Sequence, residues 1–291
     1  MQRSPWRRLV GLAYLAPALF FVLAFTVYPL LQMAWMSLHN WSLITPPSFV
    51  GLANYRRAFT DHQFWVSFLF TLEYTAIITP ILMIGGYLLA LLTVRNTPLR
   101  RFTRTVVFIP VVIGLGVSSL LWYWLFSTDF GLANRFLLDL GVIDEPLTLI
   151  RTTSGVIIGM SHILLPFMVL PMYAVMRRID PEYGRAAANL GASPLSAFLR
   201  VFLPLSLPGV LAGSLLVFVL ALGFYITPAL LGGLRDQMIS QLIVQQIQQR
   251  LDWGFGTAMS VLLVGITLAV LFAASRTVRL RDVFGSSVGE D

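Results

Sequence analysis

The sequence contains no lysine, so all 20 of its basic residues are arginines. A P-loop nucleotide site and a Schiff base both require a lysine amine, so the chain can form neither. Cysteine is also absent, which excludes disulfides, thiolate metal sites and cysteine nucleophiles. The three histidines (His39, His62 and His162) lack metal-ligand spacing, and no metal site is expected. Charged residues make up only 11% of the chain, about half the share of a soluble domain.

The chain contains long runs of apolar residues. The chain is 57% hydrophobic, with a mean hydropathy of +0.80. A membrane-spanning helix needs about 20 consecutive apolar residues. The runs predict spans at 11–36, 66–94, 105–126, 155–176, 207–231 and 255–275. Only Glu73 and His162 place an ionisable acid or base within these limits. The sequence therefore predicts an all-α integral membrane protein with six transmembrane helices, the first too long for a cleaved signal peptide.

The positions of the arginines predict the orientation of these spans. Short cytoplasmic segments carry more arginine than segments on the other side. With a cytoplasmic N-terminus, the inner segments hold Arg3, Arg7, Arg8, Arg95, Arg100, Arg101, Arg104, Arg177, Arg178, Arg185, Arg200, Arg276, Arg279 and Arg281. The outer loops hold only Arg56, Arg57, Arg135, Arg151, Arg235 and Arg250. Both termini are therefore expected in the cytoplasm.

The cytoplasmic loop at about 179–206 carries strong helix start and stop signals. Asp180 suits an N-cap position, and Pro181 suits the first helical position that follows. Gly191 is placed to end this helix. Ser193 can cap a second helix that opens at Pro194 and runs towards Leu203. The pattern predicts a helix–turn–helix whose first helix is rich in alanine and therefore open to close approach by another surface.

This loop resembles the signature loop of binding-protein-dependent ABC importer permeases. The family pattern is Glu-Ala-Ala, three residues, Gly, nine residues, then Ile-x-Leu-Pro. Here it maps onto Arg185-Ala186-Ala187, Gly191 and Val201-Phe202-Leu203-Pro204 with the spacing intact. Arg185 replaces the glutamate, and Glu182 lies one turn earlier as a candidate substitute. Further resemblance lies in Phe49–Tyr55, in Arg101–Thr105 with Phe108–Pro110, and, most like the polyamine branch, in Thr227–Gly233 with Asp252–Gly256.

The resemblance implies a type I ABC importer transmembrane domain in a bacterial inner membrane, surrounded by lipid. The loop would then be the coupling helix that docks on a separate ATPase. The residues implied in this coupling are Glu182, Arg185, Ala186, Ala187, Asn189, Gly191, Ala192, Ser193, Pro194, Leu203 and Pro204. Implied partners are a second homologous permease in a heterodimer, an ATPase dimer that binds ATP and Mg²⁺, and a periplasmic substrate-binding protein. The resemblance implies no cofactor, no enzymatic activity and no nucleic-acid partner for this chain.

The same resemblance divides the chain into three parts. Residues 1–65 would hold the N-terminal tip, the first helix and the first periplasmic loop. Residues 66–281 would form the core permease domain, and residues 282–291 a short cytoplasmic tail. The expected cargo is a polyamine such as putrescine or spermidine, or a related organic cation. A sugar, an opine or another small organic solute remains open.

Glu73 is the main candidate for contact with a cation, because a carboxylate inside a span needs water or a partner. The candidate substrate path comprises Glu73, Tyr74, Trp122, Tyr123, Tyr225 and Thr227, whose aromatic members offer cation–π faces. The alternative interpretation places Glu73 at the outer interface and the aromatic residues in the interfacial belt. For His162, a hydrogen bond to a neighbouring helix is preferred over a transport role.

Two other classes of membrane protein fit the sequence less well than a permease does. An ion-coupled secondary transporter typically has several intramembrane ionisable groups and internal repeats, neither of which is evident here. A membrane-embedded enzyme would need a motif such as His-Glu-x-x-His or Gly-x-Ser-x-Gly, and the sequence has neither.

Overall fold

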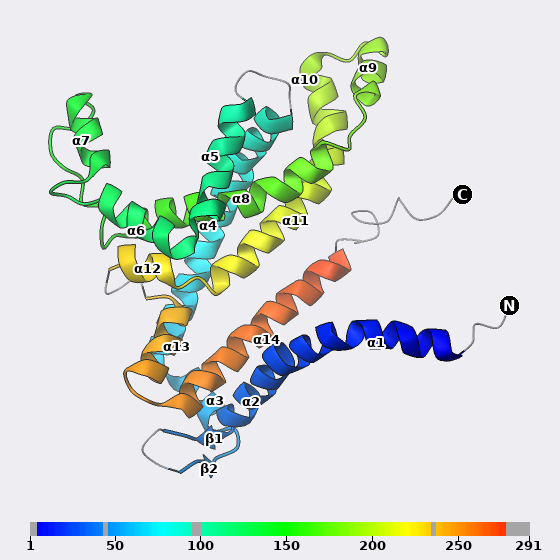
Figure 1. The fold of residues 1–291 in the computed structure, drawn as a ribbon. Coiled ribbons are helices and arrows are strands. Elements are labelled where there is room, and N and C mark those ends of the chain that lie inside the picture. The colour runs from blue at the N-terminus through cyan, green and yellow to red at the C-terminus, as the bar shows by residue number, and fades with distance from the viewer. Residues whose placement is uncertain (1–4, 43–45, 95–99, 234–236, 278–291) are drawn as a thin grey trace. The chain divides into compact units, whose positions relative to one another are not determined.

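The computed structural model describes residues 5–42, 46–94, 100–233 and 237–277. The predicted tail 282–291 lies outside these residues, as do Arg3, Arg95, Arg235, Arg279 and Arg281. Helices form most of the described chain (Figure 1). The chain divides into two compact units, one formed by residues up to 64 with 243–265, the other by 65–242 with the residues from 266 onward.

Five helical segments are long and apolar enough to cross a membrane. They are Tyr14–Ser37, His62–Val94, Thr153–Met176, Pro194–Leu222 and Trp253–Arg276. A sixth span is present if the bent pair Arg101–Ile113 and Leu115–Leu125 counts as one. The prediction of six spans is confirmed when this bent pair is counted as one span. The third and fifth spans differ in shape or limits from the predicted ones.

The first unit contains the N-terminal helices and the outer loop that follows them. Its elements are α1 (Pro5–Val22), the π turn η1 (Leu23–Val27), α2 (Tyr28–Ser37), the antiparallel pair β1 (His39–Asn40) and β2 (Ser48–Phe49), and α3 (Ala53–Thr60). It also holds most of α13 (Ile239–Gln248) and the first half of α14 (Trp253–Thr277). The π turn lies directly before Tyr28-Pro29, where the proline ring cannot fit a regular α-helical turn.

Two motifs far apart in the sequence meet in this first unit. Asn54, from the Phe49–Tyr55 motif, donates through Nδ2 to the carbonyls of Ser37 and His39 at 2.9 and 3.0 Å. A Cβ on Gly254, from the Asp252–Gly256 motif, would lie 2.1 Å from the same His39 carbonyl, so only glycine fits there. These backbone contacts join the end of α2, the outer loop and the start of α14.

An ion pair reinforces the same junction. Arg57 Nη1 donates to Asp252 Oδ2 at 2.6 Å, and its guanidinium carbon lies 3.9 Å from the centre of the Phe255 ring. The Arg57 side chain is 48% exposed, so the ion pair contributes about 1 kcal/mol or less. The two motifs therefore have a structural role in holding the outer ends of helices together.

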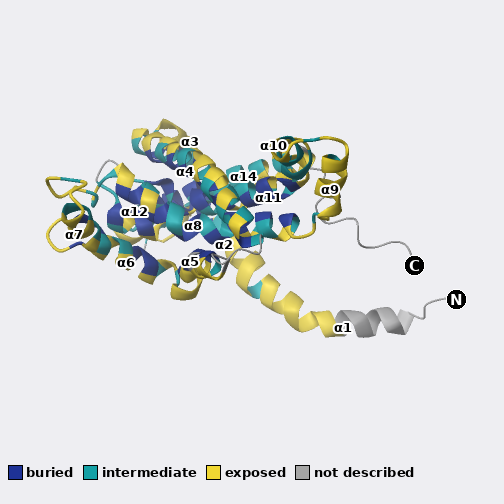
Figure 2. Ribbon diagram, turned by 90° about the horizontal axis from the view of Figure 1, so that it is seen from above, coloured by how far each residue is buried: buried dark blue, intermediate teal, exposed yellow. Residues whose placement is uncertain are grey.

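The second unit contains the remaining spans and the cytoplasmic hairpin. Its elements are α4 (His62–Val94), α5 (Arg100–Ile113), α6 (Leu115–Leu125), α7 (Leu132–Asp139), α8 (Thr153–Met176), α9 (Glu182–Asn189), α10 (Pro194–Ala197), the π turn η2 (Phe198–Phe202), α11 (Leu203–Leu222) and α12 (Ile226–Leu231). Helix α8 is its most buried element, with the dark blue of Figure 2 along much of its length.

Glycines let α4 and α11 pack closely on α8. A Cβ on Gly213 would lie 2.8 Å from the Met168 carbonyl, and one on Gly209 would lie 3.0 Å from Met172 Cα. On α4, a Cβ on Gly86 would meet Met168 Cγ at 2.9 Å. Small residues at such contacts are typical of membrane helices, which gain stability from van der Waals packing. Close helix packing therefore accounts for these glycines of the fifth span.

The third and fifth spans differ from the continuous runs that the sequence predicts. Helices α5 and α6 meet at an angle of 110° around Gly114, whose φ of +83° is accessible mainly to glycine. The fifth span starts earlier than predicted, at Pro194, and ends at Leu222. Gly223 then breaks the helix before the separate α12, so the predicted limits 207–231 are wrong at both ends.

Candidate functional site

The first helix of the cytoplasmic hairpin starts one residue later than the sequence predicts, with Pro181 at the N-cap position and Asp180 before it. Asp180 Oδ1 accepts a hydrogen bond from the backbone N–H of Glu182 at 2.9 Å. Pro181 precedes the helix, where its missing N–H leaves no helical hydrogen bond unmade. Helix α9 then runs from Glu182 to Asn189. A side-chain oxygen and a proline therefore fix where this helix begins.

Gly191 ends α9 in a Schellman motif. Its φ is +84°, in the left-handed region that carries little penalty for glycine. The N–H of Gly191 donates to the Ala188 carbonyl at 2.9 Å, and the N–H of Ala192 donates to the Ala187 carbonyl at 3.0 Å. Both ends of this eight-residue helix are thus capped, and its orientation is set by local hydrogen bonds.

The second arm of the hairpin is continuous with a membrane span. Ser193 Oγ accepts from the Ser196 N–H at 3.2 Å, and Pro194 opens α10. The chain then passes through the π turn Phe198–Phe202 directly into α11, giving one helical segment from Pro194 to Leu222. Pro204 would clash with the carbonyl four residues earlier in an α-helix, and the wider π turn relieves this contact. A displacement of the hairpin therefore moves the fifth span.

Tyr87 anchors this second arm to α4. Its hydroxyl lies 2.8 Å from Ser206 Oγ, and because Ser206 donates to the Leu203 carbonyl at 2.8 Å, Tyr87 is the donor. The Tyr87 ring also lies edge-on to Phe198, with 6.3 Å between ring centres. Sequence reasoning missed this residue, because an isolated tyrosine in an apolar run gives no sign of its partner.

Helix α9 presents nearly all of its surface to the outside of this chain. Ala187 is half-buried, whereas the other seven residues from Glu182 to Asn189 are exposed. Most of α9 is accordingly yellow in Figure 2. Leu190, just beyond its end, is 89% exposed. Arg185 Nη1 donates to Glu182 Oε1 at 2.6 Å, so the arginine at the family's glutamate position has its ion partner one turn earlier on the same helix. A capped helix with an exposed apolar end is suited to docking in a partner.

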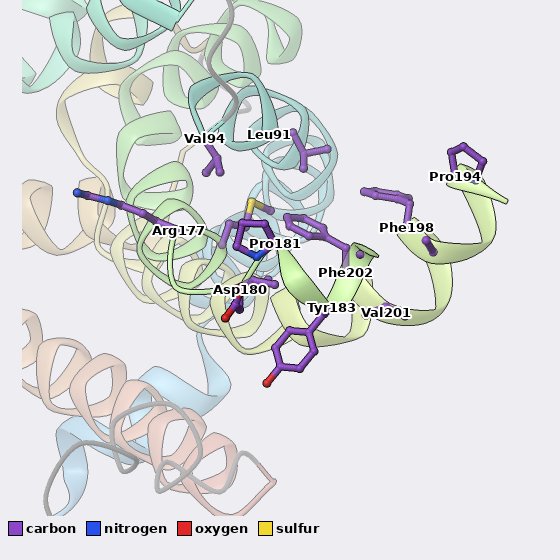
Figure 3. A pocket seen from close by; sticks show the side chains of 14 residues that line it. Leu91, Val94, Arg177, Asp180, Pro181, Tyr183, Pro194, Phe198, Val201 and Phe202 are labelled. Carbon is purple, nitrogen blue, oxygen red and sulfur yellow. The ribbon is translucent and has the colours of Figure 1, made fainter. Parts of the chain in front are cut away.

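A cavity of about 560 Å³ lies between α9 and the membrane-crossing helices of the second unit (Figure 3). Leu91, Met176 and Phe202 form part of its apolar wall, and Asp180 and Tyr183 lie on the hairpin side. The hairpin projects from one end of α8 and α11 (Figure 1). Helix α9 is thus separated from the membrane-crossing helices by this cavity on one side and contacts η2 of the second arm.

The predicted substrate-path residues fall into two groups. Glu73, Tyr123 and Tyr225 are exposed on the surface of the single chain, whereas Tyr74 and Thr227 are buried at 1% and 0% exposure. On α4, the buried positions Thr71, Tyr74 and Ile78 follow helical spacing, and Glu73 lies off that face. Its carboxylate therefore points towards something outside this chain.

Trp122 and Thr227 belong to a polar cluster that links three helices. Trp122 Nε1 donates to His162 Nδ1 at 3.0 Å, which joins α6 to α8 as the packing interpretation of His162 predicts. Ser119 Oγ lies 2.7 Å from Thr227 Oγ1 and donates to the Leu115 carbonyl at 2.8 Å, so it accepts from Thr227. The cluster joins α6 to α8 and α12. Sequence reasoning missed Ser119, since nothing near it marks a distant partner.

Comparison with known proteins shows the family of this chain. Residues 82–281 match the family described as the inner membrane component of binding-protein-dependent transport systems. The match spans well over half of the chain and contains the whole hairpin. The chain belongs to this family.

Curated relatives extend the match towards the N-terminus. The spermidine/putrescine permease PotB of Escherichia coli is 36% identical over 231 residues, covering 77% of this chain and 82% of PotB. PotB of Haemophilus influenzae is 32% identical, covering 72% of this chain and 73% of its own. The trehalose permease SugA of Mycobacterium tuberculosis is 30% identical, covering 91% of this chain and 87% of SugA.

A solved structure shows the fold of the permease. A chain of a bacterial alginate ABC transporter, solved in complex with an alginate-bound periplasmic protein, aligns with a TM-score of 0.74 over 97% of each chain at 18% identity. This permease therefore has the fold of a type I importer transmembrane domain, with six membrane-spanning helices and cytoplasmic termini. It is a multi-pass protein of the bacterial inner membrane.

Proposed function

We propose that this permease carries polyamines such as putrescine and spermidine, or related organic cations, through the membrane. Glu73 supports this, since a carboxylate exposed on a membrane-crossing helix suits a cationic solute. The similarity to spermidine/putrescine permeases of two bacteria supports the same substrate class. The chain provides the path, while a periplasmic binding protein selects and delivers the solute.

The hairpin is the proposed docking site for a separate ATPase. One observation carries this assignment: α9 is capped at both ends, is exposed, and is joined through its second arm to α11 as one helical segment. When two ATPase subunits close around ATP and Mg²⁺, a helix seated on each would move with it. Because the chain has no lysine for a P-loop, the proposal assigns ATP hydrolysis to the partner and a transport role to this subunit.

The proposed assembly contains two permeases, two ATPase subunits and one binding protein. A heterodimer of this chain with a second homologous permease would place the exposed faces of the spans against each other. The substrate path residues Glu73, Tyr123 and Tyr225 would then face the space between the two permeases, while Tyr74, Trp122 and Thr227 hold the helices that line it.

The experiment that tests the substrate class measures uptake. Cells lacking their own polyamine transport would express this permease with its second permease, ATPase and binding protein, and accumulation of labelled putrescine and spermidine would be followed. Uptake above the level of cells with an inactive ATPase is expected. Labelled trehalose serves as the comparison, because the relative SugA covers most of the chain. Trehalose uptake without polyamine uptake would replace the proposal by the sugar alternative.

A further inference from the structure

A second cavity, of about 290 Å³, lies between α4, α5 and α8 of the second unit. Its wall has a cationic part and an apolar part. Arg104, Tyr173 and Arg177 form the cationic part, and Phe108, Val169 and Leu170 belong to the apolar part. Arg104 lies near the start of α5 and Arg177 directly follows α8, whereas the three apolar residues lie about one or two turns further into the spans. The cavity is thus cationic at the cytoplasmic helix ends and apolar at membrane depth.

The Arg104 guanidinium is fixed in position by Tyr173. Its Nη2 donates to the Tyr173 hydroxyl at 2.7 Å, and its guanidinium carbon lies 5.6 Å from the centre of that ring. This hydrogen bond uses one of the five N–H donors that an arginine carries. Arg177 is exposed and also lines this cavity. Figure 3 shows its side chain extending away from the cavity under the hairpin.

Two guanidinium groups line one cavity, and their positive charges favour an anionic ligand. Within the described residues, the wall of this cavity contains no carboxylate. A polyamine would be repelled by the same two charges, so the proposed cargo does not fit. A phosphate group matches the fork of an arginine in both charge and shape. Free phosphate, however, would leave the apolar part of the cavity without a suitable occupant.

We infer that this cavity binds an anionic phospholipid from the cytoplasmic leaflet. The headgroup phosphate lies between Arg104 and Arg177, and an acyl chain runs along Phe108 and Leu170. Basic pockets between membrane helices on the cytoplasmic side are suited to anionic lipid headgroups. Because α5 and α8 both line the cavity, the lipid would join the cytoplasmic ends of two spans. The inference is independent of the proposed substrate.

The test measures lipid binding to the whole purified transporter. The complex is placed in nanodiscs of phosphatidylcholine with increasing phosphatidylglycerol, and bound lipid is counted by native mass spectrometry. The double variant R104Q/R177Q is expected to weaken phosphatidylglycerol binding by roughly 30-fold, from the typical contribution of two basic residues. The matched control R101Q/R178Q removes the same charge from neighbouring exposed positions outside the cavity wall. It should retain wild-type binding.

A third variant separates the lipid from free phosphate. Leu170→Trp fills the apolar part of the cavity without changing its charge, and it should also lose phosphatidylglycerol. Equal retention of phosphatidylglycerol by R104Q/R177Q and its control would overturn the site. Binding of inorganic phosphate alone to the wild type, with no preference for phosphatidylglycerol over phosphatidylcholine, would overturn the assignment to a lipid. Each readout is independent of transport.

Discussion

Glu73 places a carboxylate on the exposed side of α4, within a membrane-crossing helix. An acidic residue at the centre of a span costs about 2.5–3.5 kcal/mol on insertion scales, and less towards the ends. No buried residue of α4 shares its side of the helix, and the adjacent Tyr74 points into the core. Its position is therefore better explained by water, a solute or a second subunit than by packing within this chain.

Glu73→Gln is expected to lower polyamine uptake by about tenfold, as for the loss of one charge-assisted contact of about 1.4 kcal/mol. Assembly should be unchanged, because the side chain is not part of the core. Initial uptake rates and co-purification of the ATPase would be measured together. Glu145→Gln in an exposed loop is the matched control. Normal uptake by Glu73→Gln would remove this residue from the substrate path.

The Trp122–His162 hydrogen bond gives a prediction about stability. Trp122→Phe removes the donor and leaves His162 Nδ1 without its partner inside the helix bundle, which costs about 1–3 kcal/mol. A lower midpoint of thermal unfolding in detergent is expected. Trp124→Phe on the same helix is the control, since Trp124 is 66% exposed. In a double-mutant cycle with His162→Leu, strictly additive effects would contradict the contribution of this bond.

For single residues, the sequence predicts hydrogen bonds to nearby backbone groups well, and it predicts contacts between residues far apart in the chain poorly. Gly191 and Ser193 cap the hairpin helices as predicted, and Asp180 accepts the first N–H of α9 from one position before the N-cap, because such bonds depend on residues two to five positions away. The pairing of Ser119 with Thr227, 108 positions apart, follows only from the fold. The same is true of Tyr87 and Ser206.

The cytoplasmic hairpin joins an exposed helix to the fifth span. Of its two arms, α9 ends at a glycine turn, whereas α10 continues through a π turn into α11. Force applied to α9 reaches α11 through this turn and through the contact of α9 with η2. The fixed geometry of the turn is therefore as important as the docking surface itself.

Ala187→Arg is expected to uncouple ATP hydrolysis from transport. Ala187 is the half-buried residue of α9, and an arginine there would displace the helix and so the exposed surface on which an ATPase would dock. Uptake should fall at least about tenfold while ATPase activity of the purified complex persists or becomes independent of the binding protein. Ala53→Arg makes the same change in the outer loop and should transport normally. Wild-type coupling in Ala187→Arg would refute the docking assignment.

Gly191 permits a separate test of the turn. A Cβ at this position meets nothing within 4 Å, so Gly191→Ala introduces only the strain of a positive φ, about 1–2 kcal/mol. A partial loss of coupling is expected without loss of folding, measured as the ratio of solute transported to ATP hydrolysed. Gly184→Ala on α9, where a Cβ also meets nothing within 4 Å, is the control. An unchanged ratio in Gly191→Ala would show that the turn geometry is unimportant.

Hydropathy predicts where spans lie more reliably than where helices bend. The second, fourth and sixth predicted spans agree with α4, α8 and α14 to within a few residues. The 110° bend at Gly114 was not predicted, because the apolar run continues on both sides of it. The helix that opens at Pro194 is predicted, but its continuation through η2 into α11 is not.

At the scale of the whole molecule, the ionisable groups bear on how transport is driven. Its two compact units contain, within the described residues, no group of three or more His, Asp or Glu that could hold a metal ion. Among the side chains inside the spans that the sequence predicts, Glu73 and His162 are the ionisable acid and base. His162 is engaged by Trp122, which leaves Glu73 as the candidate for proton exchange.

Transport is therefore expected to depend on ATP and not on a proton gradient. In proteoliposomes that contain the full complex, labelled putrescine should accumulate when ATP is supplied on the side of the hairpin and the binding protein on the opposite side. A protonophore should leave the initial rate within about twofold, because a coupled proton would need a relay of several intramembrane groups. An inactive ATPase variant is the control for passive leak. Uptake that stops with the protonophore and persists with the inactive ATPase would instead identify a proton-coupled secondary transporter.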